Sequence, residues 1–230
     1  MLNNKKIIFI GPAGTGKTTI KQIFFDMGNP LYYLSNPLEP TKGMNSSIYT
    51  IFGTSMAIFD LAGQEMDSWL SSDRYVLNDA SLIMCVFDIN GYLQEIFKLI
   101  KKIFNFIAKK ETINCSLVVF LHKIDTIDSL YAHHKLKATK DFVLDKFGKK
   151  INADVYLTSI DKAHFLNTYQ IISKLFESLA GTRLFQDKIT ILNLENDLKI
   201  LLEYDLEKPI EIGTLFYDLE IKRNEAMIPP

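Results

Sequence analysis

Residues 11–18 read GPAGTGKT, and this short stretch limits the possible folds more than any other part of the chain. It fits the pattern G-x-x-x-x-G-K-[ST] and lies between an apolar run, KKIIFI at 5–10, and a helix-period segment at 17–28 that we expect Gly28 to end. Glycines let the backbone curl, so that its N–H groups point at a phosphate beside a helix N-terminus. The pattern in this setting predicts a phosphate-binding loop between a strand and a helix.

Past this loop, short apolar runs alternate with segments of helical period. We expect further strands at 80–89, 116–122 and 153–159, and helices at 93–107, 130–147 and 164–179. Two runs on either side of Gly53, SIYTIF and SMAIFD, are typical of an antiparallel hairpin, which would place one strand at the sheet edge. The alternation predicts an α/β fold, a mostly parallel six-stranded sheet with helices on both faces.

Two stretches interrupt this alternation. Residues 29–46 hold three prolines and no periodicity, so we expect a loop there. After Gly181 the pattern changes, with a helix expected at 189–204 and a strand-like segment at 210–221. We therefore divide the chain into a main domain, 1–181, and a short C-terminal α+β extension, 182–230. About 50 residues is marginal for an independent core, so we expect the extension to pack on the main domain or to complete a partner.

The end of the phosphate loop carries the chemistry expected of it. Lys17 should pair the β and γ phosphates of a nucleoside triphosphate, and the Thr18 hydroxyl should ligate Mg²⁺. Thr41, in LEPTKG, is expected to complete the Mg²⁺ shell when the γ-phosphate is present. Three nearby hydroxyls compete for that role: Ser46, Ser47 and Thr50.

The strand expected before residue 60 ends in DLAGQE, 42 residues after Thr18. Asp60 at this strand end can hold the Mg²⁺ through water, opposite Thr18. The Gly63 N–H can bond the γ-phosphate, which would make this loop sensitive to whether that phosphate is present. Gln64 is placed to orient an attacking water. The motif predicts a hydrolysis loop.

The arginine content bears on the rate of hydrolysis. The chain has three arginines, Arg74, Arg183 and Arg223, and none lies in the 29–46 segment. An arginine supplied in trans typically contributes roughly 10³ to 10⁵ in rate. We therefore expect the isolated chain to hydrolyse slowly. The Ala13 methyl group, beside the γ-phosphate position, would narrow the space for such an incoming arginine.

Residues 121–126, LHKIDT, follow an apolar run and predict a base-reading motif. Asp125 can accept hydrogen bonds from guanine N1–H and the exocyclic amine, while the stem of Lys123 lies along the ring. Adenine would leave Asp125 unpaired, and such sites discriminate by roughly 10⁴ or more. Ser159 and the Ile160 N–H, in YLTSI, are expected to contact the guanine O6 and Asp125. His122 is expected to tie its strand end to the phosphate loop by a hydrogen bond.

With these motifs in this order, residues 5 to about 180 resemble a Ras-superfamily small GTPase with the P-loop NTPase fold. His122 in place of asparagine, and Thr-Ser-Ile in place of the common Ser-Ala, resemble the Rag/Gtr family of nutrient-signalling GTPases. The resemblance implies a GTP-binding switch that slowly hydrolyses GTP to GDP with Mg²⁺, under GTPase-activating and exchange proteins. Family members carry a roadblock-type C-terminal domain and act as dimers. The segment at 195–220 resembles only the opening helix and strand of such a domain, and implies a homo- or heterodimer through the extension.

The candidate residues fall into three groups. Those expected to act in catalysis are Gln64, Lys17 and Thr41. Those expected to hold the metal are Thr18, Thr41 and Asp60. Those expected to contact the nucleotide are Gly11, Ala13, Gly14, Thr15, Gly16, Lys17, Thr18, Thr19, Gly63, His122, Lys123, Asp125, Ser159 and Ile160.

Composition excludes several other partners. A net charge of −1 and a pI near 6.4 give no basic excess for nucleic acid. No apolar stretch reaches about 18 residues, and neither MLNN nor EAMIPP carries a lipidation motif, so we expect no direct membrane anchor. Cys85 and Cys115 lie in or beside apolar runs, which is typical of reduced thiols. We expect a cytoplasmic protein that reaches a membrane only through a partner.

Two classes of function stay open. The first is a GTP-hydrolysing switch whose loops, about 29–47 and 60–74, report the nucleotide. The second is a nucleotide-locked scaffold subunit of a GTPase dimer, with negligible hydrolysis. An ATP-using P-loop enzyme is a third reading, which Asp125 disfavours.

Overall fold

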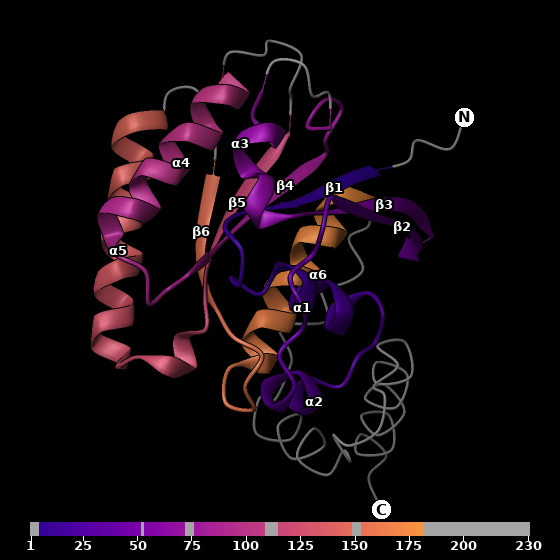
Figure 1. The fold of residues 1–230 in the computed structure, drawn as a ribbon, viewed down its shortest axis with the longest axis horizontal. Coiled ribbons are helices and arrows are strands. Elements are labelled where there is room, and N and C mark those ends of the chain that lie inside the picture. Colours follow the sequence, from indigo (N-terminus) through magenta and orange to yellow (C-terminus); the bar gives the residue numbers. More distant parts are fainter. Residues whose placement is uncertain (1–4, 52, 72–75, 109–114, 149–152, 182–230) are drawn as a thin grey trace, which may run out of the picture.

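A computed structural model describes residues 5–51, 53–71, 76–108, 115–148 and 153–181 (Figure 1). The helix and strand expected at 189–204 and 210–221 lie outside these ranges, as do all three arginines. Within the described ranges, no helix is both long enough and apolar enough to cross a membrane.

A six-stranded sheet forms the centre of the domain. Its strands are β1 (Lys5–Ile10), β2 (Met44–Ile51), β3 (Thr54–Leu61), β4 (Leu82–Asp88), β5 (Ser116–His122) and β6 (Ala153–Thr158). They lie in the order β2-β3-β1-β4-β5-β6. Every neighbouring pair is parallel except β2 and β3, which form an antiparallel hairpin with β2 at the edge. The predicted mostly parallel sheet with its edge hairpin is confirmed.

Helices cover both faces of this sheet (Figure 1). They are α1 (Lys17–Phe24), α2 (Pro30–Ser35), α3 (Met66–Trp69), α4 (Leu93–Ala108), α5 (Ser129–Phe147) and α6 (Phe165–Ala180). Residues of α3, α4 and α5 share one apolar cluster with one face of the sheet. Residues of α1 and α6 share a second cluster with the other face.

The two clusters explain the continuous apolar runs in the sequence. Strand β4, LIMCVFD, is buried at every position but its last, because helices lie on both sides of it. On α4 the buried residues follow the predicted helical stripe: Ile96, Ile100, Ile103, Phe104 and Ile107. Cys85 and Cys115 are free thiols, and Cys85 is buried in β4. The core therefore holds the strand ends, and the loops that follow them, in fixed relative positions.

Two local predictions are wrong. Residues 29–46 are not a continuous loop, because α2 occupies Pro30–Ser35 and β2 begins at Met44. The Asn29 side chain accepts a hydrogen bond from Leu31 N at 2.9 Å, and proline suits the first helical position, so the apparent helix breakers are in fact a helix start. Helix α1 ends at Phe24, four residues before Gly28.

Candidate functional site

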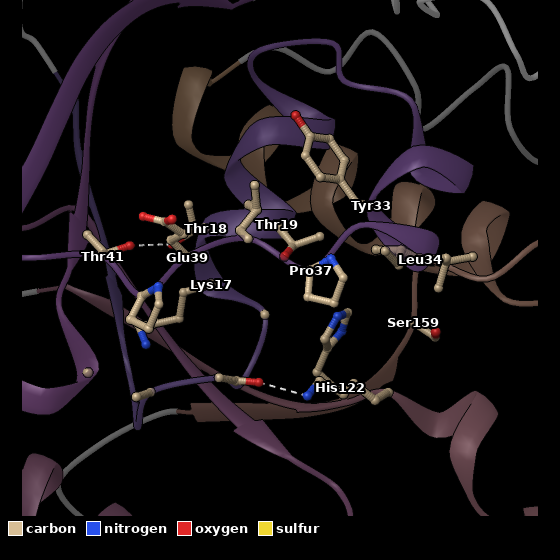
Figure 2. Close-up of a pocket in the computed structure, with 18 of the residues that line it drawn as sticks. Lys17, Thr18, Thr19, Tyr33, Leu34, Pro37, Glu39, Thr41, His122 and Ser159 are labelled. Atoms are coloured by element: carbon tan, nitrogen blue, oxygen red, sulfur yellow. Dashed lines mark hydrogen bonds between the residues drawn. The ribbon is translucent and has the colours of Figure 1, made fainter.

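A pocket of about 430 Å³ lies beyond the carboxyl ends of β1, β5 and β6, facing the segment that contains α2 (Figure 2). Ligands of open α/β sheets bind in this position. Most of the predicted site residues line it: Ala13, Gly14, Gly16, Lys17, Thr18, Thr19, Thr41, Gly63, His122, Lys123, Asp125, Ser159 and Ile160. Four do not: Gly11, Thr15 and Asp60 are buried, and Gln64 is exposed.

The phosphate loop holds a desolvated lysine. Lys17 begins α1, is 5% exposed, and donates from Nζ to Gly11 O at 2.9 Å and to Pro12 O at 2.7 Å. Burial lowers the pKa of Lys17 to about 8, although the Asp60 charge opposes this shift. A cation that has lost its water gains most from an anionic partner. The loop is thus suited to a phosphate.

Three oxygen-bearing side chains meet at one end of the pocket. Thr18 Oγ1 donates to Asp60 Oδ2 at 2.6 Å. The same hydroxyl lies 2.7 Å from Thr41 Oγ1 (Figure 2). Burial raises the pKa of Asp60, while the bond from Thr18 and the Lys17 charge oppose that rise. Among the described residues the buried Asp60 Oδ1 has no hydrogen-bond partner. A buried acceptor of this kind calls for a missing partner.

This donor set fits Mg²⁺, which prefers a carboxylate and a few neutral oxygens beside phosphate and water. The described chain has no group of three or more His, Cys, Asp and Glu that could hold a metal in their place. Thr41 is the hydroxyl that reaches Thr18, whereas its three competitors lie on β2: Ser46, Ser47 and Thr50.

The hydrolysis loop lies against the phosphate loop. A side chain at Gly63 would place its Cβ 2.2 Å from Ala13 N, so glycine is required for this close approach. Ala62 N donates to Gly43 O, and Gly43 N donates to Glu65 Oε1, each at 2.8 Å. Glu65, which sequence reasoning missed, therefore joins this loop to the segment that carries Thr41.

The base-reading residues meet at the opposite end. The Ser159 hydroxyl donates a hydrogen bond to Asp125 Oδ1, as the sequence led us to expect of this pair. Thr168 of α6 holds Ser159 in place: Ser159 N donates to Thr168 Oγ1 at 2.9 Å, and that hydroxyl donates to Ser159 O at 2.7 Å. Leu34 and Pro37, in or beside α2, line the same pocket. Their role was missed because the segment was read as a structureless loop.

The structure corrects the prediction for His122. Its Nδ1 pairs with Thr158 Oγ1 of β6 at 3.0 Å, and not with the phosphate loop. The ring instead packs on Gly16, where an added Cβ would lie 2.6 Å from its Cδ2. Burial, with the Lys123 charge, lowers the pKa of His122 to about 4, so this imidazole is neutral at physiological pH.

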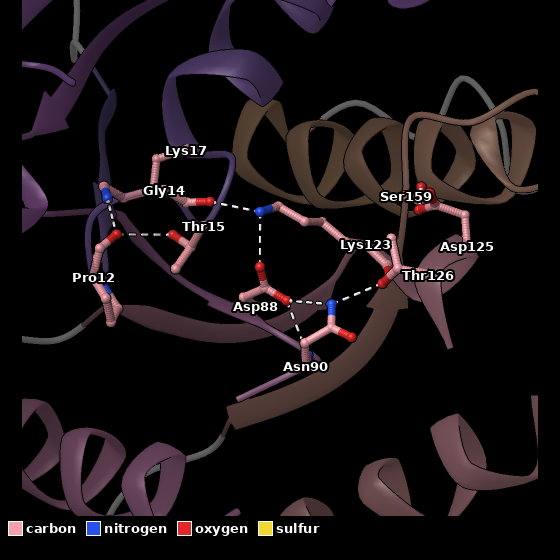
Figure 3. A network of polar contacts seen from close by, with 10 residues as sticks. All are labelled: Pro12, Gly14, Thr15, Lys17, Asp88, Asn90, Lys123, Asp125, Thr126 and Ser159. Atoms are coloured by element: carbon pink, nitrogen blue, oxygen red, sulfur yellow. Dashed lines mark hydrogen bonds and ion pairs between the residues drawn. The ribbon is translucent and has the colours of Figure 1, made fainter. Parts of the chain in front are cut away.

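Lys123 makes the polar link to the phosphate loop. Its Nζ donates to Gly14 O and to Asp88 Oδ2, each at 2.7 Å (Figure 3). Asp88 was missed because it ends an apolar run, and yet Asp60 ends another apolar run, SMAIFD, in the same way. A carboxylate at the carboxyl end of an apolar run is the signal that could have found Asp88.

Comparison with known proteins agrees with this geometry. The Gtr1/RagA G protein conserved region matches residues 6–212 of the chain. We found no match among curated proteins. Of the solved structures, a bacterial selenocysteine-specific elongation factor, EF-Sec, superposes with a TM-score of 0.56 and 18% identity, over 76% of this chain and 29% of that one.

The elongation factor SelB from Methanococcus maripaludis, in complex with the GTP analogue GppNHp, has a TM-score of 0.56 and 12% identity, over 79% of this chain and 35% of that one. The chain thus covers about a third of the length of each of these two proteins. At such identity the likeness supports the fold alone.

Proposed function

The chain belongs to the Gtr1/RagA family of G proteins, and on that premise we propose that it is a GTP-binding switch that slowly hydrolyses GTP to GDP and signals through partner proteins. One observation carries the proposal: one pocket joins the phosphate loop to the Asp125–Ser159 pair at one end and to Thr18 and Thr41 at the other, where Thr18 donates to the buried Asp60.

Different parts of the pocket bind different parts of the nucleotide. The Asp125 carboxylate recognises the two guanine donors, and Ser159 holds that carboxylate in place. Lys17 neutralises the β and γ phosphates. Thr18 and Thr41 would ligate Mg²⁺ directly and Asp60 through water, and when bound the ion would screen charge on the phosphate oxygens.

Hydrolysis requires a positioned water. Gln64 orients it for in-line attack on the γ-phosphate, and the Gly63 N–H bonds an oxygen of that phosphate. Gln64 is exposed, and the segment from 29 to 46 has no arginine, so little holds the attack geometry in the isolated chain. These two features support slow intrinsic turnover and an arginine supplied by a GTPase-activating protein.

The partners follow from the same proposal. Guanine nucleotide is the direct ligand, and activating and exchange proteins act on the loops that contain Thr41 and Gln64. We propose 1–181 as the G domain and 182–230 as the element for a homo- or heterodimer. The family match, which runs to residue 212, supports a shared role for part of that extension. We place the protein in the cytoplasm, with a partner recruiting it to any membrane.

The exposure of Gln64 also favours a second candidate, a nucleotide-locked scaffold subunit with negligible hydrolysis. Single-turnover hydrolysis of GTP by the purified chain and by Gln64→Leu separates the two. We expect a slow wild-type rate that Gln64→Leu lowers at least about ten-fold. Positioned general acid–base groups typically raise a reaction rate by that factor or more. Equal, negligible rates would favour the scaffold.

A further inference from the structure

A closed ring of hydrogen bonds lies under the base-reading end of the pocket (Figure 3). Lys123 Nζ donates to Asp88 Oδ2 at 2.7 Å, and Asp88 Oδ1 accepts from Asn90 N at 2.9 Å and Asn90 Nδ2 at 2.8 Å. Asn90 Nδ2 also donates to Thr126 Oγ1 at 2.8 Å, and that hydroxyl donates to Lys123 O at 2.6 Å. The ring therefore begins and ends on Lys123.

Lys123 needs such support because its backbone is left-handed, with φ at 68°. Non-glycine residues adopt this conformation at a cost, and they keep it only where surrounding contacts enforce it. Thr126 bonds Lys123 O twice, through its hydroxyl and through its N–H at 3.1 Å. The turn directs Asp125, two residues later, toward Ser159.

The Lys123 ammonium has two anchors from different elements, Asp88 on β4 and Gly14 O in the phosphate loop. The hydrogen bond of His122 goes to β6, so among the described residues the Lys123 bridge provides the side-chain hydrogen bond from the base-reading loop to the phosphate loop. Asp88 is its charged end. Burial opposes ionisation of Asp88, but the bonds from Lys123 and Asn90 hold its pKa below the ordinary value, so it is an anion at neutral pH.

We propose that Asp88 is a positioning residue for the guanine nucleotide: it pins the Lys123 ammonium at the floor of the pocket, so that the lysine stem faces the base and the left-handed turn presents Asp125. The inference rests on the proposed guanine-nucleotide function. Asp88 itself is not expected to touch the base.

The test compares dissociation of fluorescent GDP from the full chain and from Asp88→Ala at saturating Mg²⁺. Loss of a charge-assisted hydrogen bond predicts dissociation roughly ten-fold faster or more. Asp88→Asn keeps one acceptor oxygen and should recover part of the loss. The control is Asp145→Ala, an exposed carboxylate on α5 whose removal should leave the rate unchanged.

A double-mutant cycle with Lys123→Met separates positioning from general support of the fold. If Asp88 acts through Lys123, adding Asp88→Ala to Lys123→Met accelerates dissociation less than two-fold. A full ten-fold effect in that background would overturn the inference. If Asp88→Ala does not fold, Asp88→Asn takes its place in the cycle with the same criterion.

The outcomes distinguish the inference from the function on which it rests. If the wild-type chain fails to retain GDP, the proposed function fails. If the wild type retains GDP and Asp88→Ala releases it at the same rate, the function stands and the role of Asp88 is rejected.

Discussion

The two ends of the pocket are built in opposite ways. At the base-reading end, Asp125, Lys123 and Asp88 all have hydrogen-bond partners supplied by the chain. We call the other end, where Thr18, Thr41 and Asp60 meet, the metal end. Among the described residues, the buried Asp60 Oδ1 there has no hydrogen-bond partner, and Gln64 nearby in the chain is exposed. A preorganised recognition site needs its polar groups held by their neighbours, whereas a switch needs a part that a ligand completes. The base end is therefore suited to constant recognition and the metal end to change.

The largest effect is expected from a substitution at the base-reading end. Asp125→Asn exchanges an acceptor for a donor, which suits the extra carbonyl of xanthine and opposes the guanine amine. We expect the preference between GDP and XDP to move toward XDP by roughly 10³-fold or more, because a polar group that the wrong base covers and leaves unpaired rejects that base strongly. Dissociation constants for both nucleotides, measured on wild type and variant, check this.

Asp145→Asn makes the same chemical change at an exposed position on α5 and should leave the preference untouched. An unchanged preference in Asp125→Asn would show that Asp125 does not read the base.

The second prediction concerns the metal end. Thr41→Ala removes one of the oxygens beside Asp60, so retention of nucleotide should need more Mg²⁺, by roughly 10- to 100-fold, the range seen when support of a metal site is lost. The measurement is the rate of fluorescent GTP-analogue release across a Mg²⁺ titration.

Thr50→Ala is the matched control, because Thr50 was a competitor from sequence and lies on β2. A shift in Thr50→Ala that equals the shift in Thr41→Ala would count against the metal role of Thr41.

The sequence predicted local motifs better than contacts between distant segments. Local motifs with fixed spacing located Lys17, Thr18 and Asp60, and the alternation of strands and helices predicted the sheet. Contacts between distant segments were out of reach. Nothing in LHKIDT shows that Lys123 meets Asp88, which lies 35 residues earlier. Register between strands decides such contacts, as in the pairing of Asp88 with His122 on β5.

The error at 29–46 has a different origin. The prolines were counted as helix breakers, although Asn29 and Pro30 in that order are a helix-start signal. The consequence reached the site, because α2 brings Leu34 to the pocket wall. Short helices are hard to infer from periodicity, since Pro30–Ser35 spans less than two turns.

The smallest expected effect concerns Glu65, beside the metal end of the pocket. Glu65 accepts from Gly43 N at 2.8 Å, and Gly43 lies two residues after Thr41. Glu65→Ala leaves that N–H unpaired and frees the Thr41 segment. The bond is only partly buried, so we expect release of a GTP analogue to accelerate about two- to ten-fold, the range of a typical net hydrogen-bond contribution. Glu65→Gln keeps an acceptor oxygen and should stay near wild type.

A double-mutant cycle of Glu65→Ala with Thr41→Ala tests whether Glu65 acts through Thr41. In a Thr41→Ala background, Glu65→Ala should add little, because the hydroxyl that the Gly43 contact positions is already gone. Equal acceleration in both backgrounds would mean that Glu65 supports the hydrolysis loop independently of Thr41. If the coupling holds, the two loops move as one unit through the Gly43 contacts, and a change at Gly63 on arrival of a γ-phosphate reaches Thr41 without any movement of the base-reading end.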